Sequence, residues 1–190
     1  MEIKTRASEN MPHLALILLA LLFTTSAHAQ SPGKSFFDQK PSMWWPAVRF
    51  NAEDTNVRGI PVKSIRANWC KATEYTKALF ADDLKDDNGK NGLDEADLAF
   101  SLEGTFDGTG TRQTAVVGVY ETCRGKKGGF TLIFDRDTRK IRFVDGEDAL
   151  EPFAALRKES DTAIRVVSCL KCDLASVVRW DAKRKRFVTK

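Results

Sequence analysis

The sequence predicts an α+β fold with one antiparallel sheet of about seven strands and one main helix. Three observations support this class. After Leu98, apolar and polar residues alternate along short segments, turn-forming residues separate these segments, and an earlier segment has apolar residues spaced at three and four. The connections between the alternating segments are short, and this is typical of antiparallel hairpins.

The first 29 residues have the pattern of a secretory signal peptide. A start that carries Lys4 and Arg6 precedes an apolar run from Leu14 to Phe23, and the small-residue motif Ala27-His28-Ala29 follows. The apolar run is far shorter than the roughly 20 residues that a membrane-spanning helix needs. We therefore expect cleavage after Ala29 and a periplasmic or secreted protein that does not span a membrane.

The remaining chain predicts an arm followed by one domain. Residues 30–62 are rich in Pro, Ser and Asn without sustained periodicity, so we expect an irregular N-terminal arm. Residues 63–190 suffice for a single α+β domain with its own core. Within the arm, packing of Trp44 and Trp45 over an open sheet face is favoured over an exposed ligand-binding platform.

Residue spacing gives the elements of this domain. Asn68 is a suitable N-cap and predicts a helix from Trp69 to about Ala81, and a short helix is expected from Pro152 to Lys158. The alternating segments predict strands at Leu98–Leu102, Thr114–Thr122, Phe130–Asp135, Lys140–Val144, Ala163–Ser168, Ser176–Asp181 and Arg186–Thr189.

The four cysteines, Cys70, Cys123, Cys169 and Cys172, all follow the expected cleavage site. An even number in an exported chain predicts two disulfides, for which three pairings are possible. The short Cys169–Cys172 spacing favours a local bridge, which leaves Cys70 with Cys123. A Cys-x-x-Cys motif also serves thiol oxidoreductases, but there it opens a helix, whereas the segment after Cys172 is β-branched and predicts a strand.

Charge and composition exclude several functions. Both histidines, His13 and His28, lie in the leader, so the mature protein lacks the imidazole of Ser-His-Asp and Cys-His nucleophiles and of His-ligated zinc sites. The net charge of +4 is a mild excess, and the basic clusters fall at expected turns. We therefore expect no nucleic-acid partner and no cofactor, and an acidic surface or acidic protein fits the charge better.

The segment Asp82–Asp97 contains seven acidic residues interrupted by Asn and Gly. The spacing does not match an EF-hand. With Gly92 as the sixth loop residue, Gly89 takes a ligand position and Leu98 takes the place of the bidentate Glu. The segment therefore predicts an acidic loop, and we consider it a partner-binding lobe rather than a calcium loop.

A glycine-rich turn, Thr105-Phe106-Asp107-Gly108-Thr109-Gly110, precedes the apolar run Ala115–Val119. This pattern resembles one unit of the FG-GAP or VCBS-like repeats over Phe100–Val144. The resemblance implies a hairpin whose acidic turn holds calcium. Of the alternating carboxylates that the family uses, only Asp107 is present, so it is at most a weak calcium ligand. A single unit also cannot close a propeller.

Taken together, these features favour an exported, non-catalytic binding domain that recognises or inhibits another protein or a component of the cell envelope. The alternatives are a periplasmic thiol oxidoreductase that uses Cys169 and Cys172, and a weak calcium-dependent module. The candidate partner-binding residues are Trp44, Trp45, Asp86, Asp87, Asp94 and Asp107.

Overall fold

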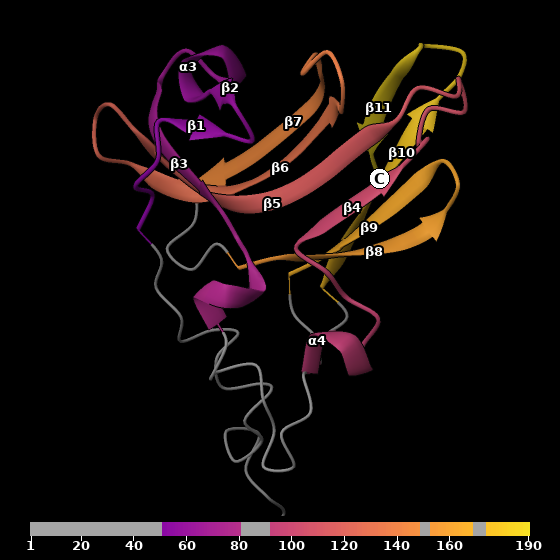
Figure 1. The fold of residues 1–190 in the computed structure, drawn as a ribbon, viewed down its shortest axis with the longest axis horizontal. Helices are drawn as coiled ribbons and strands as arrows, with labels where there is room; N and C mark the ends of the chain where they lie inside the picture. The colour runs from indigo at the N-terminus through magenta and orange to yellow at the C-terminus, as the bar shows by residue number, and fades with distance from the viewer. Residues whose placement is uncertain (1–50, 81–91, 149–152, 169–173) are drawn as a thin grey trace, which may run out of the picture. The chain divides into compact units, whose positions relative to one another are not determined.

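Two long strands, β5 (Gln113–Thr122) and β6 (Lys127–Asp135), form the centre of the fold (Figure 1). The structure, a computed structural model, describes residues 51–80, 92–148, 153–168 and 174–190. These belong to the second of two units into which the chain divides, Met1–Gly33 and Lys34–Lys190. In β5, nine of the ten residues are buried, so both faces of this strand are covered.

The first large sheet is built around β5. Strand β3 (Trp69–Glu74) pairs with the C-terminal half of β5, and β4 (Ser101–Gly104) pairs with its N-terminal half. On the other side of β5, β6 and then β7 (Ile141–Asp148) complete five antiparallel strands. The two short strands β3 and β4 therefore pair with different halves of the same side of β5.

The second large sheet has the order β11-β10-β9-β8 and is antiparallel throughout. Its strands are β8 (Ala155–Ser160), β9 (Ala163–Val167), β10 (Ala175–Asp181) and β11 (Arg186–Thr189). A backbone bridge between Ala99 and Leu156 joins it to the segment before β4. One apolar core lies between the two sheets and includes Val117 and Ile133 from the first and Ile164 and Val178 from the second.

A small layer covers the other face of the β5–β6 pair. It consists of the hairpin β1 (Asn56–Val57) and β2 (Ile60–Pro61) and the single-turn helix α3 (Val62–Ile65) (Figure 1). The second core lies beneath it. There the Trp69 ring stacks on Tyr120 with centroids 4.1 Å apart, and Phe130 packs at 5.6 Å. Two further single turns, η2 (Lys77–Phe80) and α4 (Gly92–Glu95), precede β4.

The expected α+β class with a single seven-stranded sheet is wrong. The described residues form eleven strands in three antiparallel sheets, and their α-helices are the single turns α3 and α4. The positions of the seven predicted strands are nevertheless confirmed as β4, β5, β6, β7, β9, β10 and β11, although β4 begins three residues later than expected. Hairpin pairing is local, so alternation located the strands but not their division between two sheets.

The helix expected from Trp69 is a strand, β3, and a β-bulge explains the difference. The register of β3 with β5 shifts between Trp69 and Lys71, so that Cys70 is an extra residue in the strand. Because of this extra residue, Trp69 and Ala72 both pack into the second core. Apolar residues three apart on one face imitate the spacing of a helix.

The short helix expected from Pro152 to Lys158 is also wrong where the structure describes it, because Ala155–Ser160 is strand β8. Its Ala and Leu residues favour a helix intrinsically. Pairing along the whole of β9 and the bridge from Leu156 to Ala99 give these residues a sheet environment instead. Tertiary context therefore overrides local propensity here.

Gly118 lies at a position of β5 where the structure leaves no room for a side chain. A Cβ atom at this position would clash with the backbone carbonyl oxygen of Thr73 and meet the Phe130 ring at 2.8 Å. We expect Gly118→Ala to lower the free energy of unfolding by about 2 kcal/mol, since overpacking displaces backbone as well as side chains. Urea denaturation would measure this, with Ser101→Ala in half-exposed β4 as a near-neutral control. Equal stability of Gly118→Ala and wild type would contradict this packing.

Candidate functional site

The carboxylate of Asp107 lies inside the fold, although its turn is at the surface. The Asp107 side chain is 0% exposed. Its Oδ1 accepts hydrogen bonds from the backbone N–H and the hydroxyl of Thr109 at 3.0 and 2.7 Å, and its Oδ2 accepts one from Nη2 of Arg142 at 2.9 Å. Gly108 and Gly110 adopt positive φ, so the turn can curl back over its own acid.

Arg142, on β7, connects this turn to both large sheets. Its Nη1 lies 3.2 and 3.3 Å from the two carboxylate oxygens of Asp135, a buried residue of β6. Its guanidinium carbon lies 5.5 Å from the ring centroid of Trp180 on β10, within cation–π range. One side chain thus binds two buried carboxylates and an aromatic ring from three separate elements.

The amide of Gln113 completes this cluster. Gln113 is fully buried, and its Oε1 accepts a hydrogen bond from the backbone N–H of Asp107 at 3.4 Å, while its Nε2 makes no hydrogen bond of standard geometry within the described residues. Burial acts to raise the pKa of Asp107. Hydrogen bonds from Thr109, the nearby amide of Gln113 and the charge of Arg142 outweigh burial, so the pKa of Asp107 lies below its ordinary value.

In this geometry the guanidinium of Arg142 is the cation that binds Asp107. Both carboxylate oxygens are occupied by protein donors, whereas calcium prefers several oxygen ligands. Over the described ranges, no three His, Cys, Asp or Glu side chains gather in a way that could hold a metal ion. The calcium hypothesis stays a prediction, and the ion pair with Arg142 accounts for Asp107 structurally.

The other sequence candidates lie apart from this cluster. Asp94 is on α4, where its exposed carboxylate lies 2.5 Å from Nζ of Lys77. The remaining candidates, Trp44, Trp45, Asp86 and Asp87, are outside the described residues, as are Cys169 and Cys172. The structure therefore assigns a local partner to each described candidate and does not assemble them into one site.

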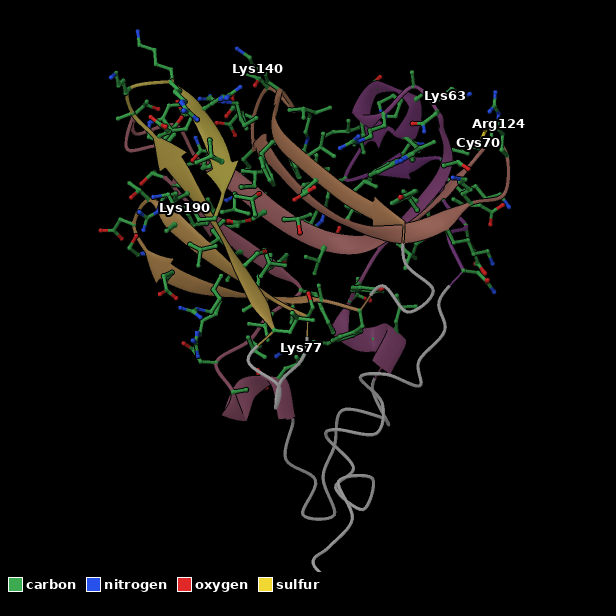
Figure 2. All side chains as sticks on the ribbon, turned by 180° about the vertical axis from the view of Figure 1, so that it is seen from behind. Lys63, Cys70, Lys77, Arg124, Lys140 and Lys190 are labelled. Carbon is green, nitrogen blue, oxygen red and sulfur yellow. A yellow bond between two sulfur atoms is a disulfide. The ribbon has the colours of Figure 1, made fainter. Side chains whose placement is uncertain are left out.

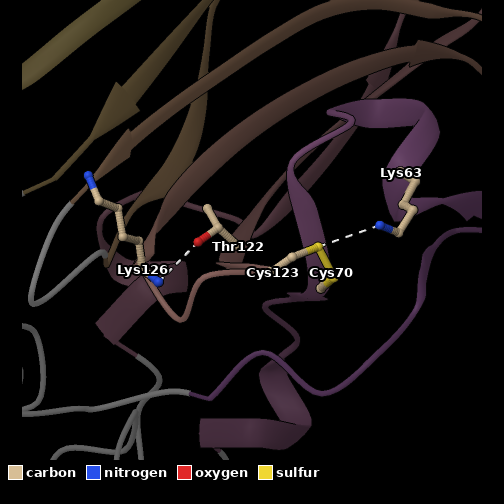
Figure 3. The surroundings of a disulfide bond; sticks show 5 residues. All are labelled: Lys63, Cys70, Thr122, Cys123 and Lys126. Carbon is tan, nitrogen blue, oxygen red and sulfur yellow. Dashed lines mark hydrogen bonds between the residues drawn. A yellow bond between two sulfur atoms is a disulfide. The ribbon is translucent and has the colours of Figure 1, made fainter.

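The pairing of Cys70 with Cys123 is confirmed, with Cα atoms 4.9 Å apart. The bond joins the bulge of β3 to the turn between β5 and β6 (Figure 3). This turn is held by its own hydrogen bonds, because the backbone N–H of Lys126 donates to the Thr122 hydroxyl at 3.0 Å and that of Gly125 donates to the Thr122 carbonyl. The disulfide thus fixes the start of β3 against the central hairpin.

A feature that sequence reasoning missed is the face of the four-stranded sheet that points away from the core, here called the outer face. In β9 and β10 the inward side chains Ile164, Val166 and Val178 are buried, so the alternate residues point outward. The outward basic residues are Arg157, Arg165, Arg179, Arg186 and Lys190, the last of which is labelled in Figure 2.

Pairing register concentrates positive charge on the outer face. Arg157 lies directly opposite Arg165, and like charges at such positions destabilise a sheet. Glu159 binds Arg165 at 2.7 Å, and this hydrogen bond, with smaller effects of the neighbouring arginines, lowers the pKa of Glu159. Within the described part of the chain, neither Arg157 nor Arg179 forms an ion pair. Two half-buried valines, Val177 and Val188, lie between the charges.

Comparison with known proteins adds no information about these residues. No protein-family model matches the chain, and no curated protein or solved structure has a significant match to it. The resemblance of Phe100–Val144 to an FG-GAP or VCBS-like unit therefore stays a prediction. No helix within the described ranges combines the length and hydropathy needed to cross a membrane.

Arg142 is expected to be the most costly cation to remove. Arg142→Met should lower the free energy of unfolding at pH 7 by about 3 kcal/mol, because it leaves two buried carboxylates without their partner. Arg112 is 65% exposed and lies 3.9 Å from Glu103, so Arg112→Met should change stability by less than about 0.5 kcal/mol. Urea denaturation of both variants would test this, and equal effects would show that Arg142 is not required.

Asp107 should make stability depend on pH in the acid range. Its pKa in the folded protein is lower than in the unfolded chain, so its stabilisation is complete above the unfolded value and is lost as pH falls through the folded value. Asp107→Asn should therefore reduce the loss of stability between about pH 5 and pH 2. Thermal unfolding at a series of pH values would measure this. Asp137→Asn, at an exposed turn position, is the control. Parallel curves for Asp107→Asn and wild type would contradict the assignment.

Proposed function

We propose that this protein is an exported, non-catalytic binding domain that recognises an acidic protein surface through the outer face of the β8–β11 sheet. The observation that carries the proposal is the excess of positive charge on that face, where five basic residues face outward beside the carboxylates of Glu159 and Asp181. Arg157 and Arg165 are placed opposite each other by register, and Arg179 lies on the adjoining strand. A sheet that accepts this repulsion in the free state gains when carboxylates of a partner neutralise it.

The type of side chain favours a protein as the partner. Four of the five outward basic residues are arginines, whose planar guanidinium groups bind carboxylates through two hydrogen bonds. Arginine is enriched and lysine depleted at the centres of protein interfaces. The half-buried valines between the charges add apolar area that a complementary surface would cover. The outer face therefore combines charge recognition with an apolar centre.

A membrane surface fits this face less well. Interfacial membrane binding relies on aromatic and long apolar side chains that enter the lipid. On this sheet the large aromatic residues Trp180 and Phe187 pack toward the core, with ring centroids 5.1 Å apart. The outward apolar residues that separate the arginines are the short side chains of valine and alanine. An acidic protein is thus the occupant that the chemistry favours.

Two further observations support the exported and non-catalytic parts of the proposal. A disulfide between Cys70 and Cys123 suits an oxidising compartment. The buried carboxylates of Asp107 and Asp135 are both bound to Arg142, so they serve the fold rather than proton transfer to a substrate.

Charge reversal on the outer face tests the proposal. The full chain with its disulfide formed would be immobilised to capture proteins from an envelope extract, beside the double variant Arg157→Glu, Arg179→Glu. We expect a retained protein with an acidic surface whose purified form binds the double variant at least about tenfold more weakly than wild type. Its binding to wild type should weaken with salt.

The matched control carries the same change in net charge elsewhere. Lys140→Glu, Lys183→Glu alters two exposed turn lysines and should bind the captured protein as wild type does. Equal binding by all three proteins would exclude the outer face. A different outcome would identify a membrane as the occupant and overturn the proposal. In that outcome, wild type binds phosphatidylglycerol vesicles, the double variant does not, and no captured protein depends on the outer face.

A further inference from the structure

The Cys70–Cys123 disulfide lies at the surface in a basic environment. Cys123 is an exposed residue and Cys70 is half-buried, so this bridge is not enclosed in a core. Nζ of Lys63, on α3, lies 3.5 Å from Sγ of Cys123 (Figure 3). Arg124, the next residue along the chain, is exposed at the same corner of the molecule, where Figure 2 shows it beside Lys63 and Cys70.

Local charge favours one sulfur of this pair over the other. An ammonium group in contact with a sulfur stabilises the thiolate that forms there when the bond is broken. The contact from Lys63 is made to Cys123, so Cys123 is the better leaving group of the two. Lys63 belongs to α3, which follows β2 in the layer that covers the second core.

We infer that Cys70–Cys123 is a thiol–disulfide exchange site that reacts with dithiols, with Lys63 as the residue that stabilises the Cys123 thiolate. This inference does not depend on the proposed binding function. It also places redox chemistry at a pair different from Cys169 and Cys172.

The exchange proceeds in two balanced steps. One thiolate of the dithiol attacks Sγ of Cys70, the Cys70–Cys123 bond breaks, and its electron pair leaves with Sγ of Cys123 beside the Lys63 ammonium. The second thiol of the dithiol loses its proton to water. The resulting thiolate attacks the other sulfur of the dithiol, which is bonded to Cys70 in the mixed disulfide, and so releases the Cys70 thiolate. The protein pair gains two electrons, and the dithiol becomes an intramolecular disulfide.

The site also has a structural consequence for the N-terminal layer. In the oxidised protein, the bond fixes the bulged start of β3 to the β5–β6 turn. After reduction, that connection depends on the hydrogen bond from the backbone N–H of Cys123 to the carbonyl oxygen of Asn68, at 3.0 Å, and on the packing of Trp69. Exchange at this site therefore changes how firmly β3 and the layer before it are held.

The test follows reduction of the native, full-length protein by dithiothreitol, with mass-spectrometric mapping to separate Cys70 and Cys123 from Cys169 and Cys172. We expect the Cys70–Cys123 bond to open without denaturant, and Lys63→Met to slow its opening about threefold, because the departing Cys123 thiolate loses the ammonium group that stabilises it. Lys140→Met removes an exposed lysine from the β6–β7 turn and should leave the rate unchanged. A rate in Lys63→Met equal to wild type, or a bond that opens only when the protein unfolds, would overturn the inference.

A second measurement isolates the sulfur that Lys63 contacts. In Cys70→Ser the Cys123 thiol is free, and its alkylation by iodoacetamide should begin at a lower pH than in the double variant Cys70→Ser, Lys63→Met. Circular dichroism would confirm that both variants are folded. If they do not fold, the dithiothreitol comparison of wild type with Lys63→Met decides alone. Identical pH profiles for two folded variants would also overturn the inference.

Discussion

Burial of both faces of the β5–β6 hairpin is the constraint on which the rest of the structure depends. Its strands carry apolar side chains in both directions, so neither face tolerates water. One face requires the second large sheet, whose Ile164 and Val178 complete the first core. The other face requires the small layer of β1, β2 and α3, which covers Phe130 and Leu132. The elements around the hairpin are there to cover it.

The same constraint explains why charged groups occur inside the protein. Where one end of the β5–β6 pair meets the Asp107 turn, polar side chains are buried with apolar ones, and an isolated carboxylate there would be costly. Arg142 offsets this cost by binding two acids at once, with Trp180 covering its guanidinium. The cluster holds the turn, β6 and β7 in one arrangement, which apolar packing alone specifies less tightly.

The positions of the strands can be predicted from this sequence better than their arrangement in sheets. Period-two alternation predicts a strand wherever one face is buried, and it found β5 and β6 even though both their faces are covered, since β-branched residues and bounding turns mark them as well. It failed at β3 because the bulge at Cys70 changes the parity of the apolar positions. The disulfide between Cys70 and Cys123 could be predicted by elimination, since one short-range pair left only these two cysteines.

The candidate sites were harder to predict for a related reason. Asp107 was visible in its glycine-rich turn, but its partner Arg142 follows 35 residues later with no motif to connect them. The outer face arises only when β8, β9 and β10 are aligned in register, because that alignment brings Arg157, Arg165 and Arg179 together. Each arginine taken singly has the sequence context of an ordinary exposed strand position.

The pairing of β3 with β5 has a consequence for the order in which the chain can assemble. A chain made from its N-terminus presents β1, β2, α3 and β3 first, yet their apolar residues are covered only by β5 and β6, which come some 50 residues later in the sequence. Trp69 and its neighbours must wait for that later hairpin, as must Cys70 for Cys123. These early strands must therefore stay exposed to water and to other chains until the later hairpin has been made.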